Sequence, residues 1–206
     1  MKKTQVAVLA SGRGSNFEAL VRASADESFP ASIALLVTDN PSAGALAFAR
    51  EHGIDTAVVD CGPRPGSMTR SSSEAIFELC RMRDVGLVCL AGFMRIVKGR
   101  LLEEYAGRML NIHPALLPSF KGLHGQKQAL EYGVRVSGCT VHFVDPGIDT
   151  GPIIVQHAVP VMQDDTEDSL SARILAEEHR AYPEAVRLFA EGRLRLEGRK
   201  VLIQDE

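Results

Sequence analysis

The sequence predicts an α/β fold in which a mostly parallel sheet lies between layers of helices, a three-layer α/β/α arrangement. Short apolar runs alternate with amphipathic segments as far as residue 113, and this alternation is typical of parallel strands joined by helical crossovers. After Pro114 the pattern changes, and two apolar runs are joined by a short loop that requires antiparallel pairing. The length of 206 residues suits one domain spanning residues 1–206.

The first half of the chain supplies the strands of the expected parallel sheet. Each is a short apolar run bounded by turn-forming residues, as buried strands are. The expected strands are Gln5–Ala10, Ala31–Val37, Thr56–Val59, Val85–Leu90 and a fifth that carries Asn111 and His113.

Capping residues indicate where the helices between these strands begin. Two stretches have the pattern of a capping box, in which a Ser and a Glu three residues later satisfy backbone N–H groups. These are Ser15 with Glu18, before a helix to about Ala25, and Ser71 with Glu74. Ser42 is expected to cap a helix over Ala43–His52, and a further helix covers Leu101, Leu102 and Tyr105.

The second half is expected to contain a short helix, an antiparallel strand pair and a long helix. The short helix lies near His124–Tyr132 and ends at Gly133. Val134–Val144 alternates in polarity and returns through the loop Asp145–Gly151 into Pro152–Val155. The long helix starts near Thr166, and Pro183 inside it should kink or break it.

Charge and hydropathy favour a small-molecule partner over nucleic acid or a membrane. The formal net charge is -3, and the basic residues near the C-terminus are interpreted as a solvated face, namely Arg193, Arg195, Arg199 and Lys200. No apolar run approaches the ~20 residues of a membrane span, and the first run is too short for a secretory signal. The four cysteines form no CxxC pair, so we expect a reduced, cytoplasmic protein.

Asn111, His113 and Asp149 are the candidate catalytic residues. Residues two apart on a strand share a face, so Asn111 and His113 project together where Pro114 ends the strand. Open α/β sheets bind ligands at such strand ends. The Gly- and Pro-rich loop before Gly151 can bring Asp149 to the same place. An amide, an imidazole and a carboxylate together suit acyl transfer or proton handling.

The turn Ser11–Asn16 is a candidate phosphate site. It joins the first strand to the first helix, and free N–H groups at a helix start favour an anion. Phe17 stands where the dinucleotide fingerprint requires a third glycine, and the Walker lysine pattern is also missing. A single phosphate is therefore favoured over a dinucleotide, with a plain strand-to-helix turn as the alternative.

The other histidines have simpler interpretations. His124 is read as helix capping and His142 as strand packing. A metal site built from His113, Asp149 and another histidine is conceivable, but no pair has a strong ligand spacing. We therefore expect no metal.

Four stretches resemble the folate-dependent formyltransferases, and within that family the branch that acts on glycinamide ribonucleotide. The resemblance runs over nearly the whole chain. The stretches are Leu9–Phe17, Leu90–Ile96, Asn111–Gly122, and Val141–Val144 running on to Asp149–Pro152. The resemblance implies a seven-stranded mixed sheet with the penultimate strand antiparallel, and formyl transfer from 10-formyltetrahydrofolate to the amine of glycinamide ribonucleotide in purine biosynthesis.

The resemblance also implies roles for particular residues. Asn111, His113 and Asp149 match catalytic positions; the substrate-binding positions are Gly14, Ser15, Asn16 and Glu178, and the folate-binding positions are Met94, Arg95, Ile96, Val97 and Asp145. A folate-contacting arginine of the family aligns with either Thr69 or Arg70, with Arg70 favoured. No tightly bound cofactor is implied, because the folate is a cosubstrate.

The expected mechanism gives each catalytic residue one task. Asn111 donates a hydrogen bond to the developing formyl oxygen, and a protonated His113 stabilises it. Asp149 favours the imidazolium and relays a proton, through water.

Four competing functions differ in what they would require. Methionyl-tRNA formyltransferase would need an added C-terminal domain and more positive charge, and formyltetrahydrofolate hydrolase an extra N-terminal domain. A non-catalytic nucleotide-binding module would leave the convergence of Asn111, His113 and Asp149 unexplained, and a metal hydrolase would need a metal. The sequence leaves the oligomeric state open.

Overall fold

A computed structural model describes residues 2–205 of the chain. Within these residues, seven strands form one sheet in the order β3-β2-β1-β5-β7-β8-β9. The predicted α/β fold with a mostly parallel sheet is confirmed. The chain divides into two compact units, one ending at Leu110 and the other beginning at Asn111, and each is described by itself.

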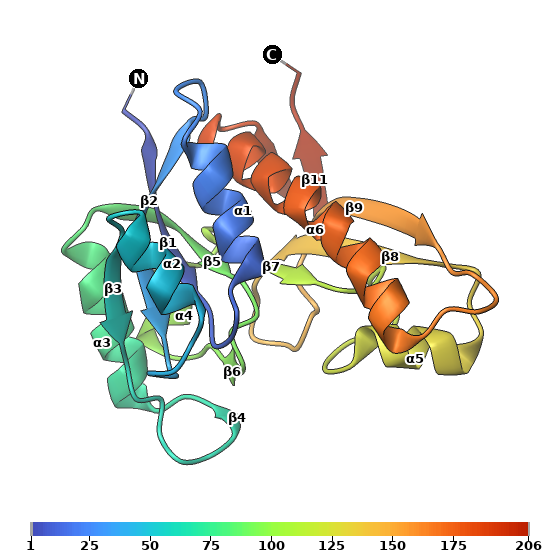
Figure 1. Cartoon of the computed structure of the whole chain (residues 1–206). Coiled ribbons are helices and arrows are strands. Elements are labelled where there is room, and N and C mark those ends of the chain that lie inside the picture. The colour runs from blue at the N-terminus through green and yellow to red at the C-terminus, as the bar shows by residue number, and fades with distance from the viewer. Residues whose placement is uncertain (1, 206) are drawn as a thin grey trace. The chain divides into compact units, whose positions relative to one another are not determined.

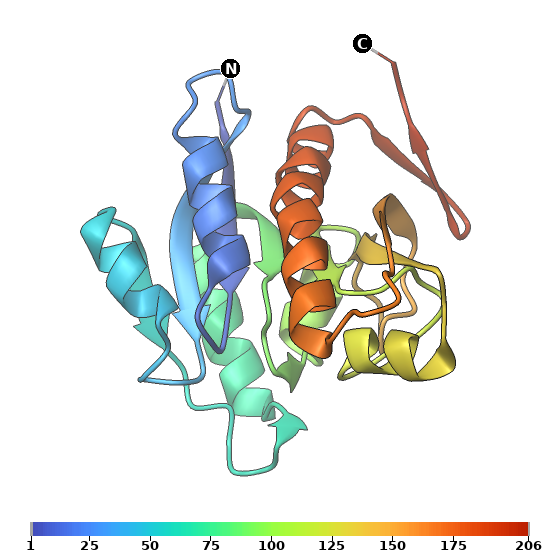
Figure 2. The same cartoon turned by 45° about the vertical axis from the view of Figure 1, so that its right-hand side comes forward.

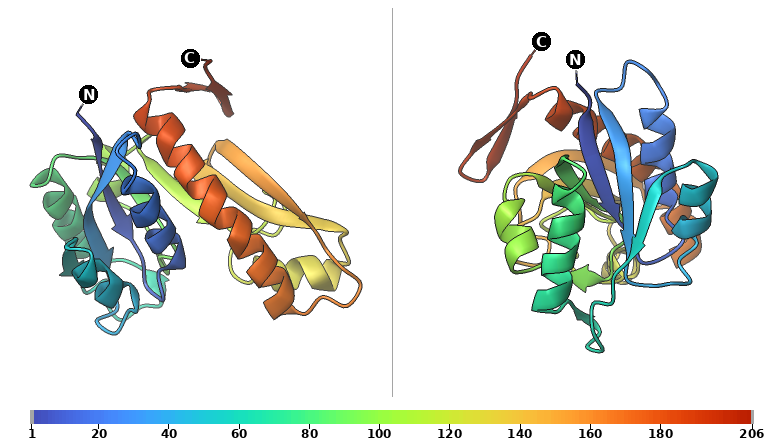
Figure 3. Two further views of the ribbon diagram at one scale, coloured as in Figure 1. Left: turned by 45° about the horizontal axis from the view of Figure 1, so that its top comes forward. Right: turned by 90° about the vertical axis from the view of Figure 1, so that its left-hand side faces the viewer.

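The first unit contains a parallel sheet between two pairs of helices (Figure 3). Its strands are β1 (Thr4–Leu9), β2 (Ala31–Thr38), β3 (Asp55–Val58) and β5 (Val85–Leu90). β1 pairs in parallel with β2 and β5, and β2 with β3. Every side chain of β1 from Val6 to Leu9 is buried, as expected of a strand covered on both faces.

The helices of the first unit are α1 (Ser15–Ser24), α2 (Ala45–Glu51), α3 (Arg70–Arg81) and α4 (Arg100–Glu104). A small second sheet pairs β4 (Gly66–Ser67) with β6 (Arg95–Ile96) in parallel. The sequence analysis did not predict this pair, because two-residue strands carry no periodicity.

The helix starts differ from those expected at three places. α1 follows Gly14 in the left-handed conformation and has no side-chain cap, so the expected Ser15–Glu18 capping box is wrong. The box of α3 is formed by Thr69 and Ser72, two residues before the expected start. Ser42 lies in a turn, where its N–H donates to the side chain of Asn40, and α2 follows Gly44.

The second unit begins within β7 (Met109–His113) and contains the antiparallel pair β8 (Val136–Phe143) and β9 (Ile153–Pro160). The antiparallel pairing expected from the short connecting loop is confirmed. α6 (Glu167–Ala190) packs on β8 and β9, and α5 (Gly125–Tyr132) contacts α6 (Figure 1). α5 ends at Gly133 in the left-handed conformation, as predicted.

α6 continues through Pro183, so the predicted possibility of a break is wrong. Figure 2 shows it as one helix, followed by a hairpin of β10 (Leu194–Glu197) and β11 (Lys200–Ile203). The predicted start is confirmed, because Thr166 caps the helix and forms a capping box with Ser169. The basic C-terminal residues lie in or beside this hairpin, and Arg195, Arg199 and Lys200 are exposed. No helix among residues 2–205 is long and apolar enough to cross a membrane.

Candidate functional site

Asn111 and His113 lie at the end of β7, where the chain turns at Pro114. The shared face predicted for them brings both to the same carboxylate, as the contacts below show. His113 is 4% exposed, and Asn111 is half-buried. The strand thus removes the imidazole from water while its polar partners remain within reach.

Asp149 reaches this strand end from the loop between β8 and β9. Its φ is 50°, which is uncommon for a residue with a side chain. The loop is held by Asp145, whose Oδ1 accepts from the Gly147 N–H at 3.0 Å. A side chain at Gly151 would place Cβ 1.7 Å from the carbonyl oxygen of Phe143. Only glycine at position 151 therefore allows the loop to return into β9 along this path.

The carboxylate of Asp149 contacts both β7 side chains. Its Oδ2 lies 3.3 Å from His113 Nδ1 and accepts from the Gly122 N–H at 2.8 Å. Its Oδ1 accepts from Asn111 Nδ2 at 3.3 Å. The three predicted catalytic residues therefore form one cluster within the second unit.

The other nitrogen of His113 fixes the tautomer of the ring. Nε2 lies 2.8 Å from the carbonyl oxygen of Phe120. Because a carbonyl oxygen only accepts, Nε2 carries a proton. In the neutral ring, Nδ1 is then an unprotonated base beside Asp149.

His142 is a fourth member of this cluster, which the sequence analysis read as strand packing. It is 2% exposed at the end of β8. Its Nε2 lies 3.2 Å from Asn111 Nδ2 and 3.6 Å from Asp149 Oδ1, while Nδ1 donates to the Phe143 carbonyl at 2.8 Å. One sequence feature could have indicated this role: His142 lies just before the loop that carries the candidate catalytic residue Asp149.

Burial and charge act in opposite directions on the pKa values of the cluster. Burial lowers the pKa of His113, and neither Asp149 nor the bond to Phe120 fully offsets it. Burial alone would raise the pKa of Asp149, but contacts from His142, the Gly122 N–H and His113 outweigh it and hold the pKa below its ordinary value. Burial therefore favours the neutral imidazole, whereas Asp149 favours the imidazolium. The protonated His113 of the expected mechanism stays a prediction.

The candidate phosphate turn keeps the predicted helix start but lacks the expected capping box. Gly14 has a φ of 85°, and an added Cβ would lie 2.6 Å from the Cβ of Ala45. This conformation starts α1 without a side-chain cap, and a helix start favours an anion through its backbone N–H groups. Ser15 is half-buried and Asn16 is buried.

The candidate folate segment, Met94–Val97, exposes alternate side chains. Met94 and Ile96 are 54% and 47% exposed, whereas Val97 is buried. The side chain of Arg95 turns back into the first unit and forms an ion pair with Asp39 at 2.6 Å.

The remaining predicted site residues lie in separate environments. Glu178 is buried on α6. The Thr69 hydroxyl caps α3, whereas Arg70 is exposed. His124 precedes α5 in the left-handed conformation, so it occupies the capping position without a side-chain capping bond. Among residues 2–205, no group of three His, Cys, Asp or Glu side chains could hold a metal ion.

A sequence model of the formyl transferase family matches residues 4–186. The chain belongs to the formyl transferase family. It is 43% identical to the phosphoribosylglycinamide formyltransferase of Bacillus subtilis over 187 residues, covering 91% of this chain and 94% of that protein. The crystal structure of glycinamide ribonucleotide transformylase 1 from Symbiobacterium toebii matches with a TM-score of 0.93 and 48% identity, covering 98% of this chain and 95% of that one.

Longer relatives contain the same formyl transferase region as a small part. The trifunctional purine biosynthetic protein adenosine-3 of Gallus gallus is 47% identical over 190 residues, which cover 92% of this chain and 19% of that protein. The chain spans between 14% and 19% of the length of the trifunctional relatives that it matches.

Proposed function

We propose that this chain is a phosphoribosylglycinamide formyltransferase that transfers the formyl group of 10-formyltetrahydrofolate to the amine of glycinamide ribonucleotide in de novo purine biosynthesis. The observation that carries the proposal is the cluster of Asn111, His113 and Asp149, in which the carboxylate contacts both β7 side chains. The B. subtilis relative of similar length, named for this activity, supports the choice of substrate.

His113 acts as the base for the attacking amine. The amine nitrogen forms a bond to the formyl carbon, and its surplus proton passes to Nδ1 of His113. Asp149 Oδ2, 3.3 Å away, stabilises the imidazolium as it forms. The bond between the formyl carbon and the folate nitrogen then breaks, and the folate nitrogen receives a proton from the imidazolium, so the proton count balances.

Asn111 stabilises the oxygen of the tetrahedral intermediate. Its two amide hydrogens point to His142 and Asp149 in the resting site. The longer of these bonds, 3.3 Å to Asp149 Oδ1, is the one that the formyl oxygen replaces. Asp149 retains the bond from the Gly122 N–H when this happens. Loss of one such donor typically costs an enzyme about 100-fold or more in turnover.

Residues outside the catalytic cluster bind the two substrates. The uncapped start of α1, with Gly14, Ser15 and Asn16, binds the phosphate of the nucleotide. The segment Met94–Val97 contacts the folate, and Asp145 and Arg70 provide further contacts. Glu178 accepts hydrogen bonds from the acceptor substrate. The folate is a cosubstrate and leaves after each turnover.

A cytoplasmic location is consistent with the four cysteines, which are buried and form no disulfide among the described residues.

Measuring formyl transfer tests this proposal. The purified chain is incubated with 10-formyltetrahydrofolate and glycinamide ribonucleotide, and the formylated nucleotide is quantified by mass spectrometry. Rapid product formation that is reduced at least 100-fold in the variant Asn111→Ala supports the assignment. A folded protein that forms no product, or an Asn111→Ala variant with normal turnover, contradicts it.

A further inference from the structure

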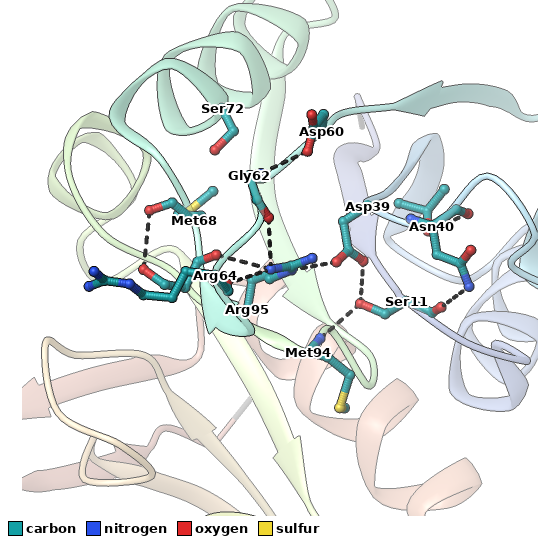
Figure 4. A network of polar contacts seen from close by, with 12 residues as sticks. Ser11, Asp39, Asn40, Asp60, Gly62, Arg64, Met68, Ser72, Met94 and Arg95 are labelled. Atoms are coloured by element: carbon teal, nitrogen blue, oxygen red, sulfur yellow. Dashed lines mark hydrogen bonds and ion pairs between the residues drawn. The ribbon is translucent and has the colours of Figure 1, made fainter.

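The hydroxyl of Ser11 is hydrogen-bonded to the folate segment, although Ser11 lies in the turn assigned to the nucleotide. Its single proton is donated to Asp39 Oδ1, with 2.6 Å between the oxygens. Its oxygen accepts the N–H of Met94 at 2.8 Å. Figure 4 shows both contacts running from Ser11 toward Asp39 and Met94. The hydroxyl therefore has no proton left to donate to a phosphate.

Asp39 holds Ser11 in this orientation and is itself held by Arg95. Its side chain is 7% exposed, and its second oxygen accepts from Arg95 Nε at 2.6 Å. The two carboxylate oxygens thus bind two different chain segments. A buried carboxylate with charge-assisted bonds on both oxygens has little freedom to rotate.

The guanidinium of Arg95 is fixed by backbone carbonyl groups on its other side. Nη1 donates to the carbonyl oxygens of Gly62, Arg64 and Ser67 at 3.3, 2.8 and 3.3 Å (Figure 4). β4 and β6 pair in the same region, with Gly66 opposite Arg95. The Arg95 side chain therefore connects the folate segment to the loop before α3 through hydrogen bonds.

We propose that Ser11, Asp39 and Arg95 act as positioning residues for the folate site, through a side-chain relay that fixes the backbone of Met94–Val97. Ser11 anchors the segment at the Met94 N–H, and Asp39 anchors it one residue later through Arg95. Met94 and Ile96 stay exposed on the anchored segment, where a ligand can reach them. The inference rests on the proposed function, because that function supplies the folate.

A purely structural role would give a different result from a positioning role. If the relay only stabilises the first unit, its loss lowers the melting temperature and leaves the affinity of the folded protein for folate unchanged. If it positions the segment, loss of the Ser11 hydroxyl weakens folate binding and spares nucleotide binding. This selectivity is informative, because Ser11 lies three residues from Gly14 in the nucleotide turn.

The experiment measures the binding of each substrate alone by isothermal titration calorimetry, together with the melting temperature and the separate kcat and KM values. The variants are Ser11→Ala and Asp39→Asn. The control is Asp55→Asn, which removes a carboxylate that accepts from Arg83 Nε at 3.1 Å on the exposed surface of the same unit.

We expect Ser11→Ala and Asp39→Asn to weaken 10-formyltetrahydrofolate binding by about tenfold, the effect of losing roughly 1.4 kcal/mol. The folate KM should rise in parallel, and nucleotide affinity should stay within about twofold, with no change for Asp55→Asn. Unchanged folate affinity in both relay variants, or a loss confined to the nucleotide, overturns the inference while the proposed function stands. A wild-type protein that does not bind 10-formyltetrahydrofolate overturns both.

Discussion

Burial and the charge of Asp149 shift the pKa of His113 in opposite directions. The first prediction concerns the contribution of His113 to turnover. We expect His113→Ala to lower kcat by about 100-fold or more, as removal of a general base does. The matched control is His52→Ala, because His52 is an exposed histidine whose ring stacks on Phe48. Near-normal turnover of a folded His113→Ala protein would remove this residue from the mechanism.

The pH dependence of turnover follows from the lowered pKa of His113. A base with a depressed pKa stays unprotonated at and above its ordinary value of 6.5. The acidic limb of the rate should therefore have its midpoint below pH 6.5, because the rate falls as the pH drops through the lowered pKa of His113 in the folded protein. A profile of kcat/KM against pH checks this, because kcat/KM reports the pKa values of the free protein. An acidic limb with a midpoint above 6.5 would show instead that the charge of Asp149 outweighs burial at His113.

Gly14 offers a prediction about stability that is separate from binding. Gly14→Ala places a side chain in the left-handed region and a Cβ 2.6 Å from that of Ala45, whereas Gly53→Ala has a similar φ of 65° and open space. We expect Gly14→Ala to cost about 1–3 kcal/mol more than Gly53→Ala, the scale of overpacking a filled site. Urea denaturation of both variants measures the difference. Equal losses would show that the contact with α2 relaxes freely.

Local sequence patterns predicted part of the site. Contacts between residues far apart in the sequence could not be predicted. Asn111 and His113 were found because two-residue periodicity and Pro114 act locally. The Asp39–Arg95 pair joins residues 56 positions apart, and no local pattern indicates it. The sequence analysis missed the role of His142. A histidine that packs in a strand and one that contacts Asn111 are both buried, so the alternating pattern does not distinguish them.

At the scale of elements, α6 provides a test of helix capping. Thr166→Ala removes the hydroxyl that accepts from the Ser169 N–H at 3.2 Å. We expect a loss of about 1 kcal/mol in the free energy of unfolding, the usual cost of an N-cap. Thr166→Ser keeps the hydroxyl and should retain most of the stability in the same denaturation series. If both variants lose the same amount, the capping bond contributes nothing measurable.

Most elements could be predicted from the sequence, whereas their starting residues could not. Apolar runs placed β1, β2 and β5 within a residue of their observed bounds. At α1, the freedom of Gly14 to adopt a positive φ replaced the expected Ser15 cap. At α3, the Thr69–Ser72 pair served as the box, because Ser at the third position can return the hydrogen bond as Glu does.

At the scale of the whole molecule, the order of the four motifs identified the family, which the match over residues 4–186 confirms. The choice of acceptor is a finer question. The net charge of -3 does not suit a tRNA, whose binding relies on neutralising phosphates. The uncapped start of α1 suits one small phosphate.

Acceptor choice therefore tests the central claim most directly. The purified chain is supplied with 10-formyltetrahydrofolate and, in parallel, with glycinamide ribonucleotide, methionyl-tRNA or no acceptor, and the products are quantified. We predict formylated glycinamide ribonucleotide alone, with neither formyl-methionyl-tRNA nor free formate above background. Formylation of the tRNA, or release of formate without an acceptor, would contradict the proposed function and leave only the family and the fold.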